Sequence, residues 1–98
     1  MPPLSDQVQE NLMSLIEGGL EIADDFLEDA VGHLQLLQFS GAVESLQNAS
    51  QAMDLVERYL PNVSERDQVL RYQTSVTTAR QRVQTLEQSI TREDTKSH

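Results

Sequence analysis

The first place to look for chemistry in this sequence is an acidic cluster. Glu21, Asp25, Glu28 and Asp29 are spaced to share a helix surface, and a histidine follows at His33. Carboxylate oxygens at such spacing are ligands that hard cations accept, so these five residues are the candidate metal ligands. The pattern favours a solvated acidic face instead, because neither the glycine-centred loop of an EF-hand nor the Glu-x-x-His pair of di-iron bundles is present.

Nucleophilic and phosphate chemistry have even less support. The chain contains no cysteine, no Gly-x-Ser-x-Gly elbow and no phosphate-binding glycine loop. His33 falls in an apolar row, and the only lysine is Lys96 near the C-terminus, which favours a buried or interface histidine over a phosphotransfer site. We therefore expect no catalytic residue and no cofactor, and we predict that the protein is not an enzyme.

Charge is divided unevenly along the chain, whose formal net charge is −9. Residues 1–60 hold eleven acids and one base, whereas residues 61–98 hold five acids and six bases. The division predicts that the acids of the earlier segments face four arginines of the last one, Arg66, Arg71, Arg80 and Arg82. A basic partner is the alternative. Because an acidic surface repels phosphates, we expect no nucleic acid and no anionic membrane as partner.

The apolar residues that must position these groups recur in steps of three and four. This is the a/d spacing of helices that pack lengthwise as in a coiled coil. Three such rows predict an all-α antiparallel bundle of three long helices, at about 6–37, 41–60 and 65–91. Phe39-Ser40-Gly41 is the predicted first turn. Residues 1–98 form one helical domain, with a polar C-terminal tail at 92–98.

Gly18 and Gly19 interrupt the first row. Glycine weakens a helix by about 1 kcal/mol relative to alanine, and a break here would give four helices. The heptad series Ile16, Ala23, Ala30 and Leu37 crosses the glycines without a change of phase, which favours a continuous or gently kinked helix. Gly19 lies in the apolar row itself, where a missing side chain lets another helix come close.

The unequal lengths of the helices indicate a partner. The first and third helices should overshoot the second at opposite ends. A single chain would then leave the apolar residues of both overhangs exposed: Leu12, Leu15 and Ile16 at one end, and Leu86 and Ile90 at the other. A second copy across a two-fold axis would cover both overhangs, so we expect a homodimer. The predicted interface residues lie in or beside these overhanging rows: Leu12, Ile16, Gly19, Val83, Leu86 and Ile90.

One segment resembles known helical modules. Phe39, Ala42, Leu46 and Ala49 match the pattern of an aromatic before Ala-x3-large-x2-Ala, which is similar to the second helix of tetratricopeptide or microtubule-interacting-and-trafficking modules. The resemblance covers residues 39–60 only. Asp54 stands where a tetratricopeptide repeat usually has proline, so we assign no family.

The function predicted from these patterns is a helical protein–protein interaction module, an adaptor or assembly subunit. A run of apolar residues long enough to cross a membrane is missing, and so is a secretory signal, which makes the cytoplasm the expected location. Two alternatives stay open. One is a small acidic chaperone for an export or assembly client, since such chaperones are also short, acidic and helical. The other is a carboxylate metal-binding helical protein.

Overall fold

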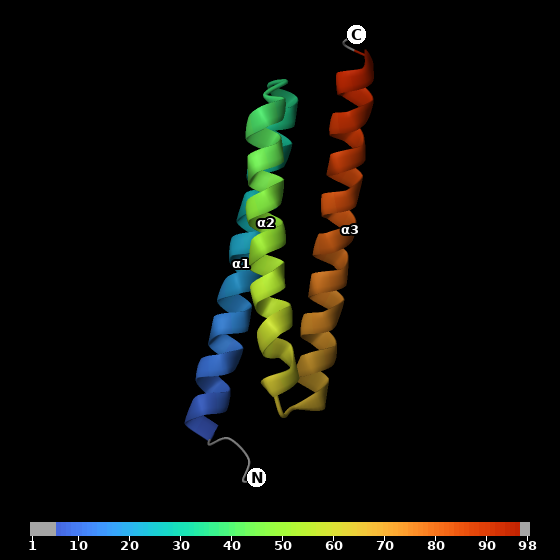
Figure 1. Ribbon diagram of the computed structural model, residues 1–98. Coiled ribbons are helices and arrows are strands. Elements are labelled where there is room, and N and C mark those ends of the chain that lie inside the picture. The colour runs from blue at the N-terminus through green and yellow to red at the C-terminus, as the bar shows by residue number, and fades with distance from the viewer. Residues whose placement is uncertain (1–5, 97–98) are drawn as a thin grey trace.

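The computed structural model of the chain describes residues 6–96 as three long helices that lie side by side (Figure 1). Helix α1 spans Asp6–Gln35, α2 spans Phe39–Tyr59 and α3 spans Arg66–Lys96, and a 3-10 turn, η1 at Leu60–Asn62, precedes α3. The rod measures 59 × 17 × 16 Å, and no strand occurs in the described residues. The predicted all-α bundle of three antiparallel helices is confirmed.

Helix α1 runs through Gly18 and Gly19 without a break, as the unbroken heptad phase predicts. The reason at Gly19 is its packing against α2. A Cβ added there would lie 2.7 Å from Cγ2 of Val56 and 3.8 Å from the carbonyl oxygen of Ala52. Contact with α2 therefore stabilises a stretch that glycine propensity alone would weaken. Gly18 differs, because nothing lies within 4 Å of its added Cβ.

Two apolar clusters fill the rod from end to end. The upper cluster contains Leu27 and Met53, both fully buried, and Val83 of α3. The lower cluster contains Ile16 and Val56. The contact between α1 and α2 is the most extensive in the bundle, because small residues line the seam between them. These seam residues are Gly19, Ala23, Ala30, Ala42, Ser45 and Ala49.

The turn between α1 and α2 lies earlier in the chain than predicted. Residues 39–41 form the first turn of α2, and the chain reverses at residues 36–38. Leu37 adopts a φ of 58°, in the left-handed region that leucine rarely occupies. The predicted turn was placed at Gly41 because glycine suits turns, yet Gly41 is needed for packing: a Cβ there would lie 2.7 Å from Nδ1 of His33.

Helix α3 is longer than expected. It continues beyond residue 91 to Lys96, so most of the predicted polar tail is helical, and residues 97–98 lie outside the described residues. The physical reason is that no glycine or proline stops the helix, and arginine, glutamate and lysine are adequate helix formers. A run of charged residues near the end of a helix does not by itself predict the residue at which the helix ends.

Candidate interaction surface

The candidate metal ligands do not converge on one point. Glu21, Asp25, Glu28 and Asp29 are exposed on α1. At about 100° per residue, they and His33 spread over about 140° of the helix surface. His33 is half-buried, with Nδ1 2.8 Å from Oε1 of Gln38. Among the described residues, no group of three or more His, Asp or Glu side chains is placed to hold an ion.

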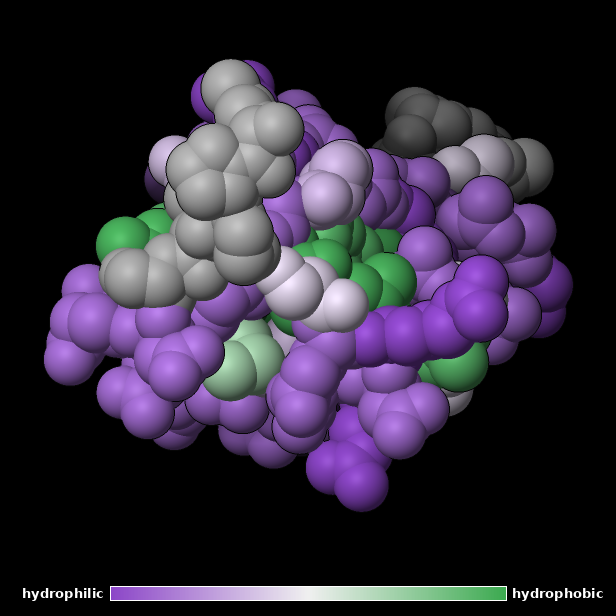
Figure 2. Space-filling view, turned by 90° about the horizontal axis from the view of Figure 1, so that it is seen from below, coloured by the Kyte–Doolittle hydropathy of each residue, from purple (hydrophilic) through white to green (hydrophobic). Residues whose placement is uncertain are grey.

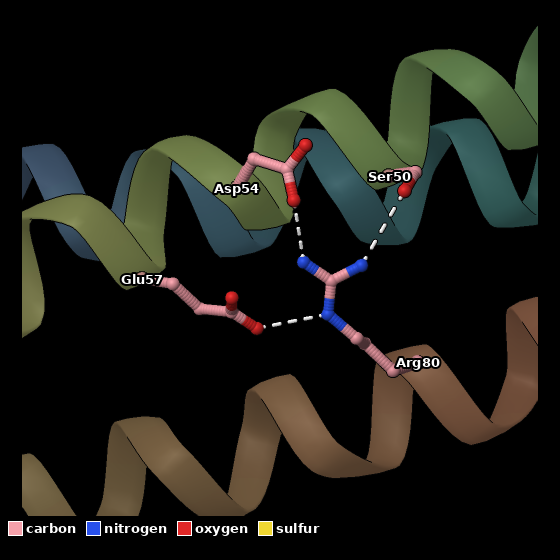
Figure 3. Close-up of polar contacts among 4 residues, drawn as sticks. All are labelled: Ser50, Asp54, Glu57 and Arg80. Carbon is pink, nitrogen blue, oxygen red and sulfur yellow. Dashed lines mark hydrogen bonds and ion pairs between the residues drawn. The ribbon is translucent and has the colours of Figure 1, made fainter.

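The predicted charge match is confirmed for Arg80, which ties α3 to α2. Its Nε donates a hydrogen bond to Oε1 of Glu57 at 2.8 Å, and its Nη2 donates one to Oδ1 of Asp54 at 2.6 Å (Figure 3). A longer contact of 3.4 Å joins Nη1 to Oγ of Ser50. The hydrogen bonds to Glu57 and Asp54 raise the pKa of Arg80 above its ordinary value, so the guanidinium stays charged.

Arg82 makes the matching connection between α3 and α1. Its Nη1 donates to Oδ1 of Asp24 at 2.7 Å. Asp24, the neighbour of Asp25 in the sequence, is thereby neutralised by α3. Arg66 and Arg71, which were also predicted to meet these acids, take part in none of the ion pairs within the described residues. Arg80 and Arg82 thus connect α3 to the faces of α2 and α1 that it covers.

Tyr72 forms a contact that the sequence patterns do not reveal. Its side chain belongs to the lower cluster and is 5% exposed, while its hydroxyl donates a hydrogen bond to Oε1 of Glu17 at 3.0 Å. Burial, and then the hydrogen bond and charge of Glu17, raise the pKa of Tyr72 from 10.0 to about 12. Glu17 is therefore bound to α3.

We expect the free energy of unfolding to fall as the pH rises from about 10 to about 12. Because the folded-state pKa of Tyr72 lies above the unfolded value, its contribution is complete below about pH 10 and is lost as the pH passes through the folded pKa. Urea denaturation of the wild type and of Tyr72→Phe, at about pH 8 and about pH 11, measures this difference. The variant should lose less stability over that interval, and an equal loss in both proteins would contradict the expectation.

The six predicted interface residues lie mostly inside the single chain. Ile16, Gly19 and Val83 are buried, and Leu12 is half-buried against the lower cluster. Leu86 and Ile90, also half-buried, pack against the upper cluster. The expectation that one chain leaves the overhanging rows bare is wrong for Ile16, which is buried, and holds for Leu15, which is 46% exposed. Helix α3 brings Ile90 next to Leu46. The homodimer itself stays a prediction.

An apolar surface does remain uncovered on α1, on the side away from α3. Leu15 is 46% exposed and Ile22 is 51% exposed. At about 100° per residue, both lie about 40–60° to one side of Gly19. Glu17 and Asp24, which bond to α3, lie about 140–160° around the helix in the opposite direction.

Leu55 and Tyr59 occupy the corresponding side of α2. Both lie on the side of Val56 away from the acids that bind Arg80. Since Val56 contacts Gly19, Leu55 stands at a level between Leu15 and Ile22. Leu55 is 39% exposed, and Tyr59 is half-buried. We define the outer face as the following residues: Leu15, Gly18, Ile22, Leu55 and Tyr59.

The view along the rod shows how the apolar surface is divided at the lower end. Figure 2 shows apolar atoms in the middle of this end, between the helices, and in separate patches on the flanks on the α1 side and on the α3 side. Hydrophilic residues cover most of the rest of this view.

Comparison with models of protein families, with curated protein sequences and with solved structures finds no match to this chain. The resemblance of residues 39–60 to tetratricopeptide helices therefore leads to no family. None of the helices in the described residues is both long and apolar enough to cross a membrane. Function has to be inferred from the geometry. Other large apolar residues are exposed too, among them Leu36, Leu37, Val43 and Leu70, but the outer face brings exposed apolar residues of two neighbouring helices to one side of the bundle.

The sequence carries a signal for the outer face that the prediction used only in part, since it expected Leu15 to be exposed but did not single out Ile22. Leu15 and Ile22 are seven residues apart, in a row parallel to the row of Ile16 and Ala23. Two adjacent rows on one helix indicate two contact directions. Packing then assigns one of these directions to the core and leaves the other exposed.

Proposed function

We propose that this chain is a non-enzymatic helical protein–protein interaction module, an adaptor or assembly subunit, that binds its partner through the outer face. The observation that carries the proposal is the exposure of Leu15, Ile22 and Leu55 together on one side of the α1–α2 pair. Scattered exposed leucines are ordinary, but a contiguous group on two adjacent helices is typical of an interaction site. Burial of such a group by a partner releases the water around it.

Gly18 supports the proposal independently of the leucines. It lies between Leu15 and Ile22 on the helix surface, three and four residues from them. No atom lies within 4 Å of its added Cβ, so packing inside the chain explains Gly19 but leaves Gly18 unexplained. The glycine weakens α1 by about 1 kcal/mol relative to alanine. A partner that approaches the backbone of α1 closely accounts for this residue.

A chaperone for an export or assembly client is the second candidate, and one observation favours it. Grooves run along both sides of α3, one beside Leu20 and Thr78 and the other beside Leu60 and Thr77. A helix with open grooves on both sides is exchanged for a client helix more easily than one that is packed on all sides. Self-association is a further form of the proposed function, with a second copy as the partner.

Site-directed photocrosslinking tests the proposed function. We expect benzoylphenylalanine at Ile22 to give a discrete crosslinked product in cells that express the protein. The matched position is Leu70, which is 56% exposed on α3 and lies outside the outer face. It should give no product. Equal crosslinking from both positions, or none from either, contradicts the proposal, and a product made of two copies of the chain identifies the partner as a second copy.

A further inference from the structure

We infer that the outer face binds an amphipathic helix of another protein, and that this helix carries basic residues at one end. The inference rests on the proposed function, because it names the partner of the same surface. It adds the chemistry of that partner and the direction in which its helix lies. The argument depends on three acids that stand at the upper end of the outer face, toward the turn between α1 and α2: Asp25, Asp29 and Glu44.

These acids lie on the same side of the α1–α2 pair as the outer face. Asp25 and Asp29 are about 120° and 80° from Gly19, in the direction of Ile22. Glu44 is about 120° from Val56, in the direction of Leu55. All three are exposed.

The register of the two helices brings the acids together. Val56 stands next to Gly19, and Gly41 stands next to His33, so α1 and α2 keep one antiparallel register from the lower to the upper part of the seam. In that register Asp29 and Glu44 face each other at nearly the same level. The three carboxylates therefore stand at the same end of the apolar surface.

The arginines of α3 pair with three acids of α1 and α2 that face it, whereas the three acids beside the outer face, like Glu21 and Glu28, are in none of the ion pairs of the described residues. Asp24, Asp54 and Glu57 each accept a hydrogen bond from Arg80 or Arg82. Asp25, Asp29 and Glu44 take part in none of the ion pairs of the described residues. Like charges that stay close together repel, so a cation brought by a partner relieves the repulsion and adds to the apolar contact.

Helix α3 shows within this chain what such a partner looks like. It binds one face of the α1–α2 pair through a single row of apolar residues, with arginines that reach acids on both helices. The outer face, on the opposite side of the α1–α2 pair, has the same two features: an apolar surface, and acids that are in none of the ion pairs of the described residues. From Leu15 to Ile22 is about 10 Å and from Ile22 to Asp29 about another 10 Å, so a helix of about 14–18 residues spans both.

A second copy of the chain does not supply the required charge. Only one base, Arg58, belongs to α1 or α2. By the same register Arg58 lies near the level of Leu15, more than two helical turns from the acids at Asp29 and Glu44. Two outer faces packed together would bring six of these carboxylates against two arginines, the Arg58 of each copy, and this excess of negative charge opposes association.

A model peptide tests the inference. The probe is a helical peptide of about 18 residues, with leucines spaced i, i+3, i+7 in one half and lysines on the same side in the other half. The control peptide has glutamate in place of each lysine. We expect the full-length protein to bind the lysine peptide at least about tenfold more tightly in fluorescence anisotropy at low salt, with a difference that shrinks as salt is added.

Matched variants locate the binding surface. The double variant Leu15→Gln/Leu55→Gln should bind the lysine peptide about tenfold more weakly than the wild type. Leu70→Gln, the same change on α3, should leave the affinity for the peptide unchanged. The triple variant that neutralises the acids (Asp25→Asn, Asp29→Asn and Glu44→Gln) should bind the lysine peptide and the glutamate peptide with similar affinity. The control for charge, Glu21→Gln with Glu28→Gln, should keep the preference for the lysine peptide.

Gly18→Gln separates binding from folding. The substitution should raise the melting temperature, because glutamine favours helix and the added side chain meets open space. It should nevertheless lower the affinity for the lysine peptide several-fold, because the glutamine side chain occupies the space next to the backbone of α1 that the peptide helix would fill. A spin label at the lysine end of the peptide should broaden the amide resonances near Asp29 and Glu44, and a label at the leucine end should broaden those near Leu15.

Three results would overturn the inference. The first is undiminished peptide affinity in the Leu15→Gln/Leu55→Gln variant, and the second is broadening confined to α3. The third is a wild-type dimer in light scattering that the same variant dissociates, together with no peptide binding. That third result makes a second copy the occupant, so the inference fails while the proposed function stands. Loss of position-dependent crosslinking at Ile22 contradicts the proposed function itself.

Discussion

Gly19→Leu is expected to destabilise the bundle by more than about 3 kcal/mol, which is a large part of the stability of a domain of this size. A Cβ at Gly19 alone would already lie 2.7 Å from Cγ2 of Val56, closer than side-chain carbons approach. Val56 is 1% exposed and belongs to the lower cluster with Ile16, so moving it would disturb that packing. The longer side chain would also meet the carbonyl oxygen of Ala52, so α1 and α2 would have to separate.

The adjacent glycine provides the control. Gly18→Leu should stabilise the chain by up to about 1 kcal/mol, because it replaces a poor helix former and its Cβ meets nothing within 4 Å. Urea denaturation of both variants at about 25 °C measures the contrast. Gly19→Ala should recover part of its loss when combined with Val56→Ala, since the second change removes the contacting methyl group. Similar stabilities for Gly18→Leu and Gly19→Leu would contradict the proposed packing.

The helices themselves follow from the sequence because one physical rule governs all of them. Apolar residues spaced three and four apart must share a helix face, and a face with that spacing packs against another. The rule also predicts the continuity of α1 through Gly18 and Gly19, because a loop has no reason to preserve heptad phase. The charge division predicts the pairing of α3 with the acids, and Arg80 and Arg82 bear this out.

The turn and the exposed surfaces are harder to predict because they depend on contacts between distant residues. Gly41 has the residue type of a turn, yet the ring of His33, eight residues earlier, is what requires a glycine there. Leu37 takes the left-handed conformation although its residue type disfavours it. The overhang argument fails at Ile16 and Ile90 for a similar reason: helix lengths do not reveal how far one helix slides along another.

The sequence also does not reveal which side of the α1–α2 pair α3 covers. Both sides offer apolar residues: Leu20 contacts the lower cluster on one side, and Ile22 is exposed on the other. The ion pairs of Arg80 and Arg82 favour the side that carries Asp24 and Asp54, and the outer face is what remains. A prediction of the interface from heptad positions therefore selects residues that the third helix buries.

Val76→Asp is expected to unfold α3 and, with it, the cooperative structure of the whole chain. Val76 is 5% exposed in the lower cluster, and an unpaired carboxylate buried there costs several kcal/mol. Helix α3 has little to compensate the loss, because its buried apolar residues are Tyr72, Val76 and Val83. An isolated helix of this polar composition is marginal in water, so α3 would lose its helical structure once detached.

The result of this substitution also distinguishes the two candidate functions. The lower cluster joins Tyr72 and Val76 to Ile16 and Val56, so we expect α1 and α2 to unfold together with α3. Circular dichroism at 222 nm should then fall for the entire chain in Val76→Asp and stay unchanged in Thr77→Asp, the exposed neighbour. If α1 and α2 instead stay folded without α3, an exchangeable third helix would support a chaperone. Cooperative unfolding makes α3 a fixed part of the scaffold and leaves the outer face to bind the partner.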